Sequence, residues 1–220
     1  KIILSLLILS FSFQAQAKNP PPGSGTSDIP ANILIMLDTS GSMNSKLYSS
    51  VQVYYPLDVS TDSAGNVYVM EYYNNRIKVF DSSGAYLRSF GSYGYGCNQW
   101  RYARQFTIYD DQIYLADTYN KRVLKLGLNG QCIRTGATVF MNPHAIAVNS
   151  SYVFVGTPGS QFEALNRSGL SQAGYQYLSS GDLNYAWGMA LNSAGNKLVI
   201  GNYYNSKVIE YNVSGSRISV

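Results

Sequence analysis

The sequence predicts an all-β protein of the β-propeller class, in which about four blades of short antiparallel strands follow one another along the chain. One pattern recurs in the sequence, with starts that lie 47, 40 and 43 residues apart. Each copy contains alternating apolar segments and ends in a glycine at a fixed distance. The composition agrees, because 20 glycines, 20 tyrosines and only 13% charged residues favour strands and tight turns over a helical bundle.

The four repeats can be aligned position by position. Each opens on Tyr or Asn followed by Pro or Ala, and three residues later comes an apolar residue that we place on the first strand: Val59, Phe106, Ile146 and Met189. Second strands are expected at 67–69, 113–115, 153–155 and 198–200, and third strands at 76–80, 122–126, 161–165 and 207–211. A turn into a fourth strand is expected at Gly84, Gly130, Gly169 and Gly215. Because one blade cannot bury both of its faces, neighbouring blades must stack around an axis.

The turns between second and third strands carry a shared pattern of acid, Tyr, Asn and base, as in Glu71 to Arg76, Asp117 to Arg122 and residues 202–207. On this pattern, residues 51–220 resemble NHL repeats. The resemblance implies a propeller of six blades, so we expect the visible blades to be part of a larger ring. Blade three departs from the pattern at 157–161, which is shorter and has neither the acid nor the base. We interpret the acid–base pairs as cross-strand ion pairs that fix the hairpin register.

The first fifty residues have a different character. Residues 1–17 are interpreted as a secretory signal peptide, because a short apolar run is followed by Ala15-Gln16-Ala17. The run is too short for a transmembrane helix, which needs roughly 20 residues. Residues 18–30, rich in Pro, Gly and Ser, are expected to be a linker. We therefore expect a secreted or cell-surface protein, and export would permit a disulfide between Cys97 and Cys132 while leaving the free thiols as the alternative.

Residues 31–50 hold an apolar run, Ile33 to Leu37, followed directly by Asp38-x-Ser40-x-Ser42. This segment resembles the start of a von Willebrand factor A domain with its metal-ion-dependent adhesion site. The resemblance implies that Ser40 and Ser42 bind Mg²⁺ or another divalent cation through their hydroxyls, and Asp38 directly or through water. The family's later Thr and Asp ligands have no counterpart, so the propeller is either inserted in the A domain or the A domain is degenerate. An ordinary Ser- and Gly-rich turn after a strand is the alternative.

Aromatic residues in equivalent turns and in one connection predict a ligand-binding face, composed of Tyr72, Tyr73, Tyr119, Tyr203, Tyr204 and Trp100. Tyr and Trp are enriched in interfaces, although packing of these rings over adjacent blades explains them equally well. His144 is the only histidine, so the multi-histidine zinc site of NHL-type lyases is not reproduced, and we expect it to pack or hydrogen-bond. The net charge of +4 is not gathered in one block, which argues against a nucleic-acid partner.

These features together predict an exported cell-surface binding or adhesion protein, rather than an enzyme, that recognises a protein or glycan. Its layout is similar to that of type IV pilus tip adhesins, so membership of a pilus or surface filament is expected. An NHL-type lyase or lactonase is one alternative, but the blade starts that face the axis are expected to be mostly apolar or small. A purely structural element of a surface filament is another.

Overall fold

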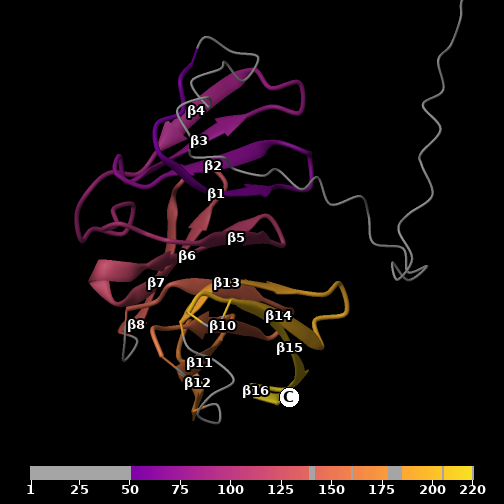
Figure 1. The fold of residues 1–220 in the computed structure, drawn as a ribbon. Helices are drawn as coiled ribbons and strands as arrows, with labels where there is room; N and C mark the ends of the chain where they lie inside the picture. Colours follow the sequence, from indigo (N-terminus) through magenta and orange to yellow (C-terminus); the bar gives the residue numbers. More distant parts are fainter. Residues whose placement is uncertain (1–50, 139–141, 160, 178–184, 205, 220) are drawn as a thin grey trace, which may run out of the picture. The chain divides into compact units, whose positions relative to one another are not determined.

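The computed structural model describes residues 51–138, 142–159, 161–177, 185–204 and 206–219. These residues form four antiparallel sheets of four strands each, together with one short 3-10 helix at Thr118–Asn120 (Figure 1). The predicted signal peptide, linker and A-domain start, including Asp38, Ser40 and Ser42, lie outside the described residues and stay predictions. Among the residues described, no helix is long and apolar enough to cross a membrane.

Each sheet is a meander whose strands pair in chain order, and we number the sheets as blades 1 to 4. Blade 1 comprises β1 (Pro56–Thr61), β2 (Val67–Glu71), β3 (Arg76–Phe80) and β4 (Tyr86–Phe90). Blade 2 comprises β5 (Phe106–Tyr109), β6 (Gln112–Asp117), β7 (Arg122–Gly127) and β8 (Cys132–Thr138). Blade 3 comprises β9 (Ala145–Val148), β10 (Tyr152–Gly156), β11 (Gln161–Asn166) and β12 (Gln172–Tyr177). Blade 4 comprises β13 (Ala186–Leu191), β14 (Lys197–Asn202), β15 (Lys207–Ser214) and β16 (Arg217–Ser219). The predicted repeat is confirmed, with Val59, Phe106, Ile146 and Met189 on the four first strands.

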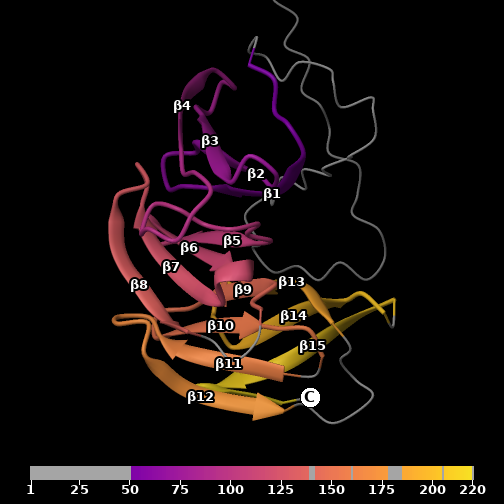
Figure 2. The same ribbon diagram turned by 90° about the vertical axis from the view of Figure 1, so that its left-hand side faces the viewer.

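Side chains that alternate along the strands pack each blade against its neighbours. In β6, Ile113 and Leu115 belong to the core shared with blade 1, whereas Tyr114 and Ala116 belong to the core shared with blade 3. A third core, which includes Phe154 of β10, joins blades 3 and 4, whose sheets lie side by side in Figure 2. The first strands adjoin one another in the order β1, β5, β9 and β13. The blades therefore bury one another's faces, as the repeat requires.

The predicted turn glycines are mostly confirmed. Gly84, Gly130 and Gly215 have positive φ, and a side chain at Gly130 would also lie 2.5 Å from the Phe90 ring. In blade 3 the left-handed position shifts by one residue, to Leu170 with φ of 52°. The Leu170 side chain is fully buried in the core between blades 2 and 3, which accounts for the shift.

The predicted ion pairs are present at the ends of the second strands. Asp117 accepts a hydrogen bond of 2.8 Å from Arg122 Nε, and the fully buried Glu71 pairs with Arg76 and, at 3.2 Å, with Lys78. Burial by itself raises the pKa of Glu71, but its hydrogen bonds from Arg76, the backbone of Tyr54 and Asn74 outweigh it and hold the pKa below its usual value. In blades 1 and 2 each carboxylate accepts a hydrogen bond from a backbone N–H ahead of the blade, that of Tyr54 or Arg101, and another from an Asn side chain of the hairpin. This is a structural role.

A disulfide joins Cys97 in the connection between β4 and β5 to Cys132 at the start of β8, with their Cα atoms 5.5 Å apart. The sequence leaves open whether these cysteines form a disulfide or stay free thiols, and in the structure they form the disulfide. The link fixes the connection that precedes blade 2 to the outer strand of that blade.

Candidate ligand-binding face

Aromatic rings gather at the end of the blades where the first strands begin. The turn between second and third strands reaches the same end, because Pro56 pairs with Glu71 and Ala186 pairs with Asn202. In blade 1 a backbone hydrogen bond of 3.1 Å runs from Tyr72 N to Tyr55 O. An equivalent bond of 3.1 Å runs from Tyr203 N to Tyr185 O in blade 4. Tyrosines from two segments of blade 1, and from two segments of blade 4, are thereby brought together.

These rings form two clusters joined through one arginine. In blades 1 and 2 the ring centroids are 4.8 Å apart for Tyr55 and Tyr73, and 5.5 Å apart for Tyr102 and Tyr119. In blade 4, Trp187 stacks with Tyr203 at 5.0 Å, and both contact Tyr185. The Arg104 guanidinium lies 5.8 Å from the Tyr72 ring centroid and 4.9 Å from that of Trp187. We call this set the aromatic face: Tyr54, Tyr55, Tyr72, Tyr73, Tyr93, Tyr102, Tyr119, Tyr185, Trp187, Tyr203 and Tyr204.

Most of the aromatic face is open to solvent. Tyr73 is 56% exposed, Tyr119 51%, Tyr203 57% and Tyr204 64%, whereas Tyr72 is half-buried. Five of the six aromatic residues predicted from the sequence therefore lie on this face. Packing explains part of their positions, because each contacts another ring, but it leaves about half of several side chains uncovered.

Trp100 is the exception, and its assignment to the exposed face is wrong. Its side chain is 0% exposed and belongs to the core between blades 1 and 2. The connection from 91 to 105 folds back on itself, with Trp100 N donating to Ser92 O at 3.0 Å, and this turns the indole inward. A side chain at Gly91 would lie 2.0 Å from that ring, so the glycine makes the room that Trp100 fills.

The tyrosines that open three of the blades share an uncommon backbone conformation. Tyr55, Tyr102 and Tyr185 have φ values of 48°, 50° and 79°, in the left-handed region that bulky residues seldom adopt. Such conformations persist only where the surrounding structure imposes them, and they concentrate at functional sites. Their recurrence at one repeat position shows that the conformation belongs to the blade start rather than to one irregular loop.

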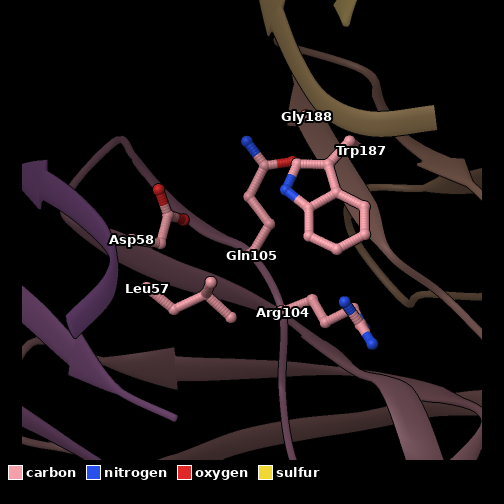
Figure 3. Close-up of a pocket in the computed structure, with 6 residues that line it drawn as sticks. All are labelled: Leu57, Asp58, Arg104, Gln105, Trp187 and Gly188. Atoms are coloured by element: carbon pink, nitrogen blue, oxygen red, sulfur yellow. The ribbon is translucent and has the colours of Figure 1, made fainter. Parts of the chain in front are cut away.

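A pocket of about 130 Å³ lies beside this face, where the first strands begin. Figure 3 shows its lining: Leu57, Asp58, Arg104, Gln105, Trp187 and Gly188. These residues occupy the same two positions, the first and second after the repeat's Pro or Ala, in blades 1, 2 and 4. His144 and Ala145 occupy them in blade 3.

Sequence reasoning missed this pocket. The expectation of apolar or small residues at the blade starts holds for Leu57 and Gly188 but is wrong for Asp58, Arg104 and Gln105. The aligned repeats do contain an indication of the pocket, because polar residues stand at the first two positions after Pro or Ala. Among the described residues, no group of three or more His, Cys, Asp or Glu is arranged to hold a metal ion.

Asp58 and Gln105 link the blades at the base of the pocket. Asp58 Oδ2 accepts a hydrogen bond of 2.8 Å from Phe106 N, which joins β1 to β5. Gln105 Oε1 accepts hydrogen bonds from Ile146 N at 2.8 Å and from Met189 N at 3.3 Å, and its Nε2 donates to Met189 O at 3.1 Å. The Gln105 amide therefore connects the start of blade 2 with the first strands of blades 3 and 4.

The pocket itself carries little negative charge below neutral pH. Burial raises the pKa of Asp58 to about 7, although the backbone N–H groups of Phe106 and Val59 counteract the rise. Burial and the nearby charge of Arg104 lower the pKa of His144 to about 4, so this imidazole is neutral at pH 7. Arg104 is then the main charged group of the pocket below neutral pH.

The raised pKa of Asp58 predicts a pH dependence of stability. Because the folded protein holds this proton more tightly than the unfolded chain, the stabilisation is present below pH 4 and is lost as pH rises through about 7. Asp58→Asn, which stays neutral, should flatten the free energy of unfolding between pH 4 and 7 in urea titrations. Asp81→Asn is the control, because hydrogen bonds lower the pKa of Asp81 and this group therefore does not titrate between pH 4 and 7. In this variant the fall in the free energy of unfolding between pH 4 and 7 should remain. An unchanged slope in Asp58→Asn would contradict the assignment.

The fold and this site can be compared with known proteins. Residues 49–219 match the DUF5128 family, described as a 6-bladed beta-propeller. Because the match spans most of the sequence, the protein belongs to this family. The described residues contain four blades of such a propeller. No curated protein matches the sequence.

Two solved structures are similar in fold. A chain of Kuenenia stuttgartiensis hydrazine synthase superposes with a TM-score of 0.60 at 10% identity, over 78% of this chain and 49% of that one. This chain therefore spans about half the length of that relative. The computationally designed Ika4 protein superposes with a TM-score of 0.57 at 13% identity, over 78% of this chain and 100% of its own. At these identities the likeness supports the propeller fold alone.

Proposed function

We propose that the protein is a binding protein, rather than an enzyme, and that it recognises a protein ligand through the aromatic face. The observation that carries the proposal is the continuity of this face across blades 1, 2 and 4. Exposed apolar side chains are ordinary when scattered, but a contiguous patch is typical of an interaction site. Tyr and Trp also supply a large contact area at low cost in conformational entropy. Export to a cell surface or filament remains part of this proposal and depends on residues 1–17.

The orientation of the rings favours a protein over a glycan. A sugar ring stacks on a free, flat aromatic face, but here many faces already contact another group. Trp187 stacks with Tyr203 and makes a cation–π contact with the Arg104 guanidinium. Tyr55 packs edge to face against Tyr73. Ring edges and hydroxyl groups are left for the ligand, which suits the mixed polar and apolar surface of a protein.

A phage-displayed library of random peptides, panned on the immobilised protein, tests this proposal. Peptides that bind it should lose at least about tenfold in affinity when Tyr73→Ala and Tyr203→Ala are combined, since an interface aromatic often contributes 2 kcal/mol or more. Both side chains are more than half exposed, so the fold should tolerate the changes. Tyr86→Ala with Leu87→Ala, on the outer strand β4, is the matched control and should leave the affinity unchanged.

Three results would count against the aromatic face as a protein-binding surface. Peptide affinity that is equal in the tyrosine variant and the wild type would remove the face from recognition. Binding on a glycan array without any selected peptide would replace the protein by a glycan ligand. Loss of binding on chelation and in Asp38→Ala, with the tyrosine variant unaffected, would place recognition at the predicted cation site of Asp38, Ser40 and Ser42.

A further inference from the structure

We propose that the pocket beside the aromatic face anchors a carboxylate group of the protein ligand, held by the guanidinium of Arg104. This inference rests on the proposed function and adds the chemistry of the ligand's anchoring group. The expected anchor is an Asp or Glu side chain, or the carboxyl terminus of the ligand, that enters between Leu57 and Asp58 on one side and Trp187 on the other (Figure 3).

The first support is that none of the ion pairs among the described residues includes Arg104. Its Nε is also buried without a hydrogen-bond partner in that part of the protein. Its contacts are the rings of Tyr72 and Trp187, which attract a cation but accept no conventional hydrogen bond from it. A carboxylate that enters the pocket would supply an acceptor that the buried Nε lacks among the described residues.

The second support is that the neighbouring groups do not supply the missing anion. Asp58 lies in the same pocket but makes no ion pair with Arg104, and its raised pKa leaves it largely uncharged just below neutral pH. Glu71 and Asp117 are already paired with cations of their own hairpins. None of these described groups therefore supplies the anion, and the proposal assigns it to the ligand.

The third support is the size and position of the pocket. A cavity of about 150 Å³ holds one benzene molecule, so a pocket of about 130 Å³ fits one side chain rather than an extended ligand. A carboxylate can accept two parallel hydrogen bonds from a guanidinium, which a point charge cannot offer as specifically. Arg104 also lies between the two aromatic clusters, where a central anchor surrounded by contact residues is expected.

Nuclear magnetic resonance of the full-length protein tests the pocket without knowledge of the partner. Propionate, the carboxylate probe, should shift the Nε–Hε signal of Arg104 in a saturable way, and the neutral propionamide should not. Arg104→Gln should abolish saturable propionate binding, and Arg104→Lys, which keeps the charge but loses the planar fork, should weaken it. Arg101→Gln is the matched control, because Arg101 lies on the same segment and contacts Tyr93 but does not line the pocket.

The selected peptides give the second readout. Those that depend on Tyr73 and Tyr203 should be enriched in Asp or Glu at one position, and Arg104→Gln should weaken them at least about tenfold. Peptides that need the tyrosines but neither an acid nor Arg104, or equal responses to propionate and propionamide, would overturn the carboxylate anchor and leave the proposed function standing. Propionate binding at Arg104 with no tyrosine-dependent peptide would support the pocket and contradict the proposed function.

Discussion

Asp117→Ala should lower the free energy of unfolding by about 3 to 5 kcal/mol, because it leaves a buried cation without its counter-ion. The Asp117 carboxylate is fully buried and accepts hydrogen bonds from Arg122 Nε, from Asn120 Nδ2 at 2.9 Å and from Arg101 N at 2.8 Å. Its removal would leave all three donors without this acceptor at the base of the aromatic face. Urea denaturation followed by circular dichroism measures the change.

The control for this prediction is an exposed ion pair within blade 4. Glu210 is 55% exposed and pairs with Lys197 at 2.6 Å, so Glu210→Ala should cost at most about 1 kcal/mol. Similar losses in the two variants would contradict the structural role assigned to Asp117. Arg122 keeps hydrogen bonds to Gly96 O and Gln99 O, so the fold should survive at low temperature.

Gln105→Ala should lower the free energy of unfolding by about 2 to 3 kcal/mol, because three backbone groups lose their partner at the pocket. These are the N–H groups of Ile146 and Met189 and the carbonyl of Met189, which tie blades 3 and 4 to blade 2. Water that enters the pocket can replace some of these hydrogen bonds, so we expect a smaller loss of stability than three unreplaced hydrogen bonds would cause.

Gln112→Ala is the matched control for Gln105→Ala. Gln112 lies at the start of β6 and accepts one hydrogen bond of 3.2 Å, from the Tyr114 hydroxyl, so its loss should cost at most about 1 kcal/mol. Equal unfolding midpoints of wild type and Gln105→Ala in urea would show that this amide does not connect the blades.

The strands could be predicted from the sequence because their signals are local and repeated. Alternation of apolar and charged residues, as in Ile77, Lys78 and Val79, depends only on the strand's two faces, and the turn glycines mark the hairpins. The shift from Gly169 to Leu170 could not be predicted, since it depends on the packing of Leu170 in the core between blades 2 and 3.

The aromatic face was partly predictable and the pocket was not. Tyr73 and Tyr203 lie in turns, whose place at one end of a blade follows from strand order. Trp100 lies in an irregular connection, where the sequence pattern gives no direction for the side chain. Asp58, Arg104 and Gln105 come together only when different blades meet, so their chemistry appears once the repeats are placed around the axis.

The central claim is that ligand binding takes place at the end of the blades where the first strands begin. Amide chemical-shift mapping of the labelled protein with one selected peptide tests it most directly. We predict that the largest shifts fall in 54–58, 72–75, 102–105, 185–188 and 203–204. Largest shifts in the turns at the opposite end, 62–66, 81–85, 127–131 and 192–196, would contradict the claim.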